Sequence, residues 1–159
     1  DSAATTAQVM IILSAAAVLA WYLTSTGIAV AITNAILSLS SDPIHLFLLI
    51  NVAVLVAGMF LDAASIMVIL GPLFYKVGTQ VGIDPVHLGV VLTVNGAIGM
   101  FTPPFGLNLF VASSLGGVNY EQAVRGALPF IGLAIIGLAI VTYMPEISMW
   151  LPRMLYPGL

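Results

Sequence analysis

The chain has 159 residues, of which 61% are hydrophobic and only 6% are charged. Soluble domains carry about 25% charged residues, so this composition predicts an all-α integral membrane protein whose partner is the lipid bilayer. The net charge of −3 and the absence of a basic patch argue against a nucleic-acid partner, and the lack of cysteine excludes disulfides and thiolate metal sites.

The first apolar run predicts a membrane-spanning helix. Roughly 20 apolar residues cross a bilayer, and Ala7 to Leu23 fits, with Trp21 and Tyr22 as an interfacial belt. A shorter and more polar run, Ile28 to Leu39, predicts a connecting helix along the interface or the protein flank. We assign 7–41 to a scaffold helix plus this arm. The N-terminus lacks the charged segment of a signal peptide, and we expect the chain to be a portion of a longer protein.

A helix start signal follows at Asp42-Pro43, because Asp is a good N-cap and Pro is favoured at the first helical position. The predicted helix runs to Gly58, where Met59 to Asp62 interrupts it. The chain is helical again from Ser65, with a soft interruption at Gly71-Pro72, and turns at Gly82. The segment 42–82 therefore predicts a re-entrant helical hairpin.

The same signal returns at Asp84-Pro85, 42 residues later. This helix runs to Gly99, breaks over 100–106 and resumes from Leu107 to Leu115, so 84–115 predicts a broken helix. The two starts reflect either a repeat, chance or shared capping chemistry. In each case about 15 helical residues cover on the order of 22 Å, which reaches only partway across a bilayer. We group 42–117 as one unit, which the family resemblance given below implies to be part of a transport domain.

The last segment, 118–159, predicts one more spanning helix and an interfacial tail. A turn over 116–119 precedes Glu121 and Arg125, which form an exposed pair one helical turn apart. We expect the spanning helix from Gly126 to Met144. The tail contains three prolines, so we expect it to lie at the interface rather than span.

The break over 99–106 carries the strongest chemical signal. Thr102-Pro103-Pro104 removes two backbone donors, and Gly99 and Gly106 flank it with flexible joints. The freed carbonyls and the Thr102 hydroxyl are hard oxygen ligands suited to Na⁺, and transporters build ion and solute sites at such breaks near the midplane. The alternative is a proline kink that merely bends a spanning helix.

Asp62 is the one acidic residue deep inside an apolar stretch, where an ionised carboxylate is costly without a cation, a donor or a proton. It binds a cation or caps the helix that begins near Ser65, and the two roles are compatible. We expect this hairpin tip to meet the Thr102 break. The predicted solute- or ion-binding residues are Asp62, Ala63, Ala64, Ser65, Asn95, Gly99, Thr102, Pro103, Pro104, Gly106 and Asn108, with Thr102 and Gly99 as the Na⁺ ligands. For the two asparagines, the alternative is helix-to-helix hydrogen bonding.

Two stretches resemble a known family: Gly-Ile-Asp-Pro-Val-His-Leu-Gly-Val-Val (82–91) and Asn-Gly-Ala-Ile-Gly-Met-Phe-Thr-Pro-Pro-Phe-Gly-Leu-Asn-Leu-Phe-Val-Ala-Ser (95–113). With the rest of 51–113 they resemble the large membrane subunit of tripartite ATP-independent periplasmic (TRAP) transporters. The resemblance implies the C-terminal portion of that subunit, within the second of two inverted repeats.

The resemblance further implies an elevator-type secondary transporter of the bacterial inner membrane, crossing it several times. It would be driven by Na⁺ and import organic acids of the C4-dicarboxylate or sialic acid type. The implied partners are a periplasmic solute-binding protein, a small four-helix membrane subunit and the remaining N-terminal half of the large subunit. That missing half would hold the matching hairpin and break, and hence half of the site.

Two rival readings remain. A sodium-coupled divalent-anion symporter has a related architecture, and a membrane anchor or assembly subunit would need no Thr-Pro-Pro break. An enzyme is not expected: an intramembrane aspartyl protease needs two close carboxylates, and only Asp62 lies deep in the sequence.

Overall fold

The computed structural model describes residues 25–39 and 42–156, together with scattered positions between residues 3 and 22. The predicted span from Ala7 to Leu23 therefore lies largely outside the described residues. Within the described part, the regular structure consists of α-helices and contains no strand, which confirms the all-α prediction.

Most helices begin and end close to the predicted positions, because capping residues fix their starts. The helices are α2 (Ile28–Leu39), α3 (Pro43–Gly58), α4 (Ala63–Ile69), α5 (Gly71–Gln80), α6 (Pro85–Gly99), α7 (Leu107–Gly116), α8 (Tyr120–Tyr143) and α9 (Pro145–Leu155). Asp42 and Asp84 each accept hydrogen bonds from backbone N–H groups of the first turn of their helix, as the Asp-Pro signals predicted.

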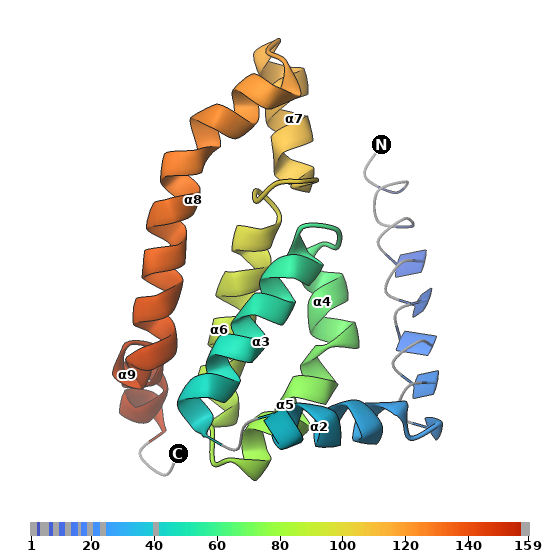
Figure 1. Ribbon diagram of the computed structural model, residues 1–159, viewed down its shortest axis with the longest axis vertical. Helices are drawn as coiled ribbons and strands as arrows, with labels where there is room; N and C mark the ends of the chain where they lie inside the picture. Colours follow the sequence, from blue (N-terminus) through green and yellow to red (C-terminus); the bar gives the residue numbers. More distant parts are fainter. Residues whose placement is uncertain are drawn as a thin grey trace.

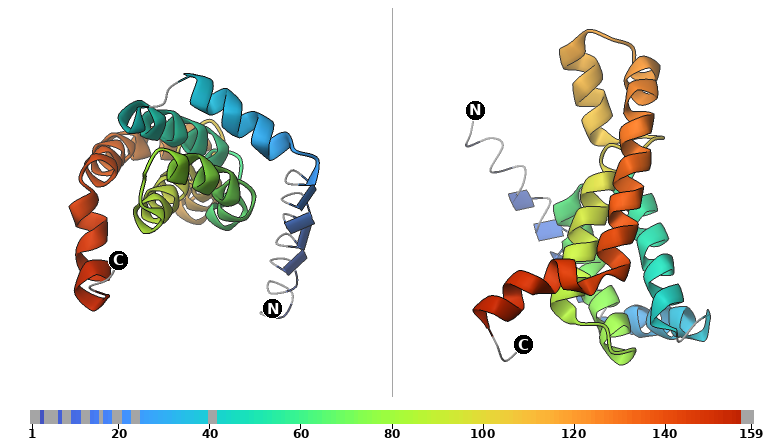
Figure 2. Two further views of the ribbon diagram at one scale, coloured as in Figure 1. Left: turned by 90° about the horizontal axis from the view of Figure 1, so that it is seen from below. Right: turned by 90° about the vertical axis from the view of Figure 1, so that its left-hand side faces the viewer.

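The chain folds into a hairpin, a broken helix and a long flanking helix (Figure 1). Helix α3 rises from the lower end, and α4 and α5 return to it. Helix α6 rises beside α3, and α7 continues upward beyond the break. Helix α8 runs the full height of the bundle, alongside α6 and α7. Helix α2 lies across the lower end. Seen from below, α2 and α9 extend outward at the periphery of the bundle (Figure 2).

Helix lengths separate the spanning element from the shorter ones. Among the described residues, α8 is the one helix long and apolar enough to cross a membrane, with 24 residues or about 36 Å. Helix α3 has 16 residues, about 24 Å, so the hairpin tip lies at the height of the middle of α8 (Figure 1). The 15 residues of α6 and the 10 of α7 together match the length of α8.

Helices α3 and α6 pack in parallel at the centre of the bundle, in a register fixed by three contacts. Near the lower end, the rings of Phe47 and His87 meet edge to face at 5.2 Å. Halfway up, Asn95 bonds to Asn51. At the upper end, Gly58 meets Gly99. Buried aliphatic side chains fill the spaces between them: Leu46, Ile50, Val54, Leu88, Val91 and Leu92.

The start of α8 differs from the predicted one. Helix α8 begins at Tyr120 rather than at Gly126, because Asn119 provides an N-terminal cap: its backbone N–H donates to Gln122 Oε1 at 3.1 Å. The tail is helical over Pro145–Leu155. Pro145 occupies the first turn, where no backbone donor is needed.

Candidate functional site at the hairpin tip and the helix break

The hairpin tip is organised by Asp62. Its Oδ1 accepts a hydrogen bond from Ser65 N at 3.0 Å, and its Oδ2 accepts one from the Ser65 hydroxyl. The carboxylate thereby caps α4, which confirms the capping role, and Ser65 is buried. The lone pairs that remain on the two oxygens are available to a cation, so the ion-binding role stays a prediction.

The break between α6 and α7 is held by its own backbone. Asn108 N donates to Met100 O at 2.9 Å across the gap, and the Thr102 hydroxyl donates to Ile98 O at 2.7 Å. Gly106 adopts φ +51, a left-handed conformation that favours glycine, and immediately precedes α7. The Pro103–Pro104 peptide bond is cis. The predicted break is confirmed.

The tip and the break touch along a line of small residues. A Cβ built on Gly99 would lie 2.5 Å from Gly58 Cα, so only glycine fits there. One turn earlier, a Cβ on Gly96 would lie 3.4 Å from Ala63 Cβ. Gly106 N donates to Met59 O at 3.2 Å, which ties the break to the tip through the backbone. The structure therefore brings together the two regions that the sequence predicted to meet.

Three carbonyls in the break accept no hydrogen bond within the described residues: those of Phe101, Thr102 and Pro103. The next two are already occupied, because the Tyr120 hydroxyl lies 2.7 Å from both Pro104 O and Phe105 O. Tyr120 was not predicted, since nothing in the sequence links it to a break 16 residues away. The chemistry left at the break is a set of hard oxygens beside the Thr102 hydroxyl, which suits a cation such as Na⁺.

The two predicted asparagines lie in different surroundings. Asn95 is fully buried and donates to Asn51 O at 2.8 Å and to Asn51 Oδ1 at 2.9 Å. Asn51 in turn donates to the Thr142 hydroxyl on α8 at 3.0 Å. The side chain of Asn95 thus makes the helix-to-helix bonds of the alternative reading, while its Oδ1 has no hydrogen-bond partner among the described residues. Asn108 is exposed at the start of α7.

The sequence matches the family described as "Tripartite ATP-independent periplasmic transporter, DctM component" over residues 1–147. The chain belongs to this family. It is 40% identical over 155 residues to a C4-dicarboxylate TRAP transporter large permease protein, DctM, of Vibrio cholerae, covering 98% of this chain and 34% of that protein. The sialic acid permease SiaM of the same organism is 34% identical, covering 94% and 35%. The 2,3-diketo-L-gulonate permease YiaN of Escherichia coli is 32% identical, covering 92% and 34%.

The chain therefore spans about a third of the length of the TRAP permeases it matches. These relatives are permease proteins of transporters and not enzymes. The match confirms the resemblance inferred from residues 82–91 and 95–113, and it places the tip and the break inside the family-matched region.

Proposed function

We propose that this chain forms part of the permease of a sodium-coupled secondary transporter that imports organic acids. The contact between the hairpin tip and the helix break is the observation that carries the proposal. A Na⁺ ion would be held by the free carbonyls beside Thr102 and by the tip residues that begin with Asp62. Cation-binding oxygens at opposed helix breaks near the midplane are a recurrent design of secondary transporters.

The hairpin is proposed to be re-entrant. Its tip lies at the height of the middle of α8, which is the one described helix long enough to span (Figure 1). Non-helical backbone at such a depth must be enclosed by protein or line an aqueous cavity. The bonds from Gly106 to Met59 and from Tyr120 to the break satisfy part of this requirement. The three free carbonyls then need an ion, water or solute.

The solute class and the partners follow from the family. Relatives carry names for C4-dicarboxylate, sialic acid and 2,3-diketo-L-gulonate transport, so we propose an organic acid as the solute. The whole transporter would comprise the N-terminal part of the large subunit, a small membrane subunit and a periplasmic solute-binding protein in the bacterial inner membrane. An elevator movement of the hairpin and broken helix would carry the solute across.

The test is organic-acid uptake into proteoliposomes that contain the full-length parent and its small subunit, supplied with loaded binding protein. Uptake should require an inward Na⁺ gradient. Thr102→Ala and Asp62→Ala should each reduce the initial rate about tenfold or more at limiting Na⁺, because each removes an oxygen near the proposed ion. Raising Na⁺ should restore part of the rate.

The chain offers matched controls for both changes. Thr93 lies on α6 and bonds to Gly89 O at 2.8 Å in the same i−4 pattern as Thr102, so Thr93→Ala should leave uptake unchanged. Asp42 caps α3 as Asp62 caps α4, so Asp42→Ala should lose the cap without changing the Na⁺ dependence. Equal tolerance of all four variants would indicate a membrane anchor and overturn the proposal.

A further inference from the structure

A cavity at the lower end of the bundle holds two unpaired, opposite charges. It has a volume of about 350 Å³ and lies between the start of α3, the turn before α6, and α9. Asp84 and Arg153 both line it, and no ion pair joins them within the described residues. The rest of the wall is mostly apolar or aromatic, and its two other polar side chains, His87 and Thr142, already have hydrogen-bond partners in the fold. The remaining lining residues are Pro43, Ile44, Phe47, Gly82, Ile83, Tyr143 and Pro145.

Asp84 uses only half of its carboxylate for the fold. Its Oδ1 accepts from Val86 N at 2.8 Å and His87 N at 3.2 Å, which caps α6. Its Oδ2 has no hydrogen-bond partner in the described part of the chain, and neither has the guanidinium of Arg153. A carboxylate that lines an apolar wall lacks part of its hydration, so a donor with positive charge is favoured beside it.

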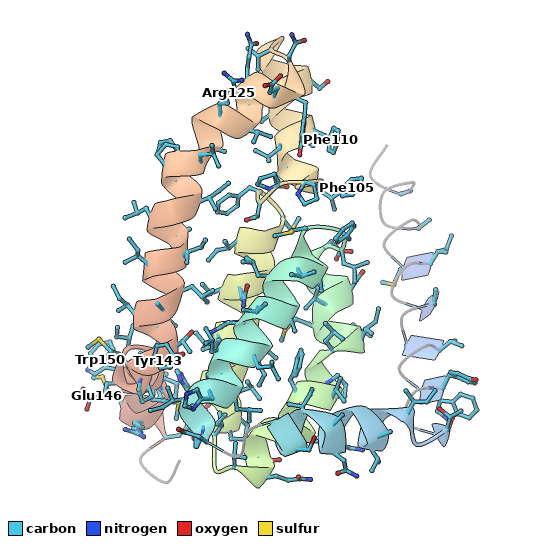
Figure 3. All side chains as sticks on the ribbon, in the orientation of Figure 1. Phe105, Phe110, Arg125, Tyr143, Glu146 and Trp150 are labelled. Carbon is cyan, nitrogen blue, oxygen red and sulfur yellow. The ribbon has the colours of Figure 1, made fainter. Side chains whose placement is uncertain are left out.

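This end of the molecule has the features of a membrane interface. Trp150 on α9 is 68% exposed (Figure 3), and the apolar side chains of Met154 and Leu155 on the same helix are exposed as well. Glu146 and Arg153 are the charged residues of this helix. A short helix with exposed aromatic and apolar residues beside charged ones is typical of an element lying in the headgroup region. The cavity therefore lies where lipid headgroups would be found.

We propose that this cavity binds the headgroup of phosphatidylethanolamine. The phosphate would accept hydrogen bonds from Arg153, whose planar guanidinium suits two phosphate oxygens at once. The primary ammonium would donate to Asp84 Oδ2. The glycerol and the first acyl carbons would lie against Phe47, Ile44 and Ile83.

The two charges discriminate among lipids. A choline headgroup carries no N–H and cannot donate to Asp84. A glycerol headgroup leaves the lipid with a net negative charge beside an unneutralised carboxylate, which is repulsive in a partly apolar setting. Phosphatidylethanolamine satisfies both ends, so the site is selective for a zwitterion with a primary amine rather than for negative charge.

The experiment uses the purified complex of the full-length parent and its small subunit, delipidated in detergent. Phosphatidylethanolamine, phosphatidylcholine and phosphatidylglycerol with identical acyl chains are added in turn. Native mass spectrometry counts the lipids retained, and thermal unfolding records the stabilisation. We expect phosphatidylethanolamine to be retained about fivefold more strongly than either competitor. A factor of this size is what one partly exposed ion pair contributes to affinity.

Variants locate the preference. Arg153→Gln and Asp84→Asn should each abolish it, and Asp84→Asn keeps an acceptor for the α6 cap, so folding is preserved. Arg153→Lys should keep part of it. Arg125→Gln is the matched control, because Arg125 is exposed and paired with Glu121 at the opposite end of α8 (Figure 3). Equal retention of all three lipids, stronger retention of phosphatidylglycerol, or a preference unchanged in Arg153→Gln would each overturn the proposal.

Discussion

Helices α3 and α6 begin with nearly the same five residues, yet the chain does opposite things after them. Both start at Asp-Pro with His three residues after the Asp, and both end in Gly-Met-Phe. After α3 the chain reverses into a hairpin, because Asp62 caps a returning helix. After α6 two prolines delay the next helix until Gly106 turns it onward. The residues after the break, and not those that start the helix, decide its direction.

Burial separates the two helices as well. His87 of α6 is 3% exposed, and its two ring nitrogens lie 2.6 Å from Ser148 Oγ and 3.1 Å from Thr142 O. His45 of α3 holds the same place in its start signal, but it is exposed and pairs with Asp42 at 3.0 Å. The cause is position: α6 is packed against α3, α8 and α9, whereas α3 has one face outside the bundle.

The largest effect should come from breaking the contact where α3 and α6 end. In Gly99→Ala the new Cβ would lie 2.5 Å from a backbone atom, so the tip and the break must separate. We expect a destabilisation of about 1–3 kcal/mol and loss of uptake. Unfolding in mixed micelles and proteoliposome uptake measure the two. Gly89→Ala on the same helix meets nothing within 4 Å and should change neither, so equal effects of the two variants would refute the contact.

The histidine pair should give the next largest difference. His87→Ala removes a buried ring and leaves Ser148 and the Thr142 carbonyl without it, which should cost about 2 kcal/mol in unfolding free energy. His45→Ala removes an exposed pair and should cost less than about 0.5 kcal/mol. If both variants lost the same unfolding free energy, the greater burial of His87 would make no difference to stability.

Local chemistry explains what the sequence could predict. Asp-Pro starts, the Thr102-Pro103-Pro104 break and the Gly82 turn each act over a few residues, and all are found where predicted. The start of α8 was missed by six residues, although the Asn119 and Gln122 cap was visible in the sequence. The polar first turn of α8, Tyr120 to Arg125, precedes the apolar run from which a spanning helix is predicted.

Long-range pairings could not be predicted in the same way. The bond from Asn51 to Thr142 joins residues 91 apart, and the cavity between Asp84 and Arg153 joins residues 69 apart. A single sequence shows that such polar groups need partners in an apolar setting but does not say which partners. The contact between the hairpin tip and the helix break was predictable only because each follows an Asp-Pro start by one short helix of similar length.

The asparagine network sharpens the comparison at mid-height. Asn95→Ala removes both bonds to Asn51, and we expect a loss of about 1–2 kcal/mol in unfolding free energy. Thr142→Val removes one bond to Asn51 and should cost about 0.6 kcal/mol, the average for such bonds in membranes. A double-mutant cycle between Asn51→Ala and Asn95→Ala checks this. Additive losses would show that the two side chains do not interact.

A similarly small effect should come from the support that Tyr120 gives to the α6 break. Tyr120→Phe removes the hydroxyl that lies 2.7 Å from Pro104 O and Phe105 O. Pro104 and Phe105 are both exposed, so water or a neighbouring donor can replace part of the bond. The loss of unfolding free energy should therefore be about 0.6 kcal/mol. The Tyr75 hydroxyl makes no hydrogen bond within the described residues, so Tyr75→Phe is the control. Because a carbonyl released by Tyr120→Phe adds an oxygen beside Thr102, the sodium concentration for half-maximal uptake should shift in Tyr120→Phe and not in Tyr75→Phe. An identical sodium dependence in both variants would separate the carbonyls that Tyr120 holds from the proposed ion site.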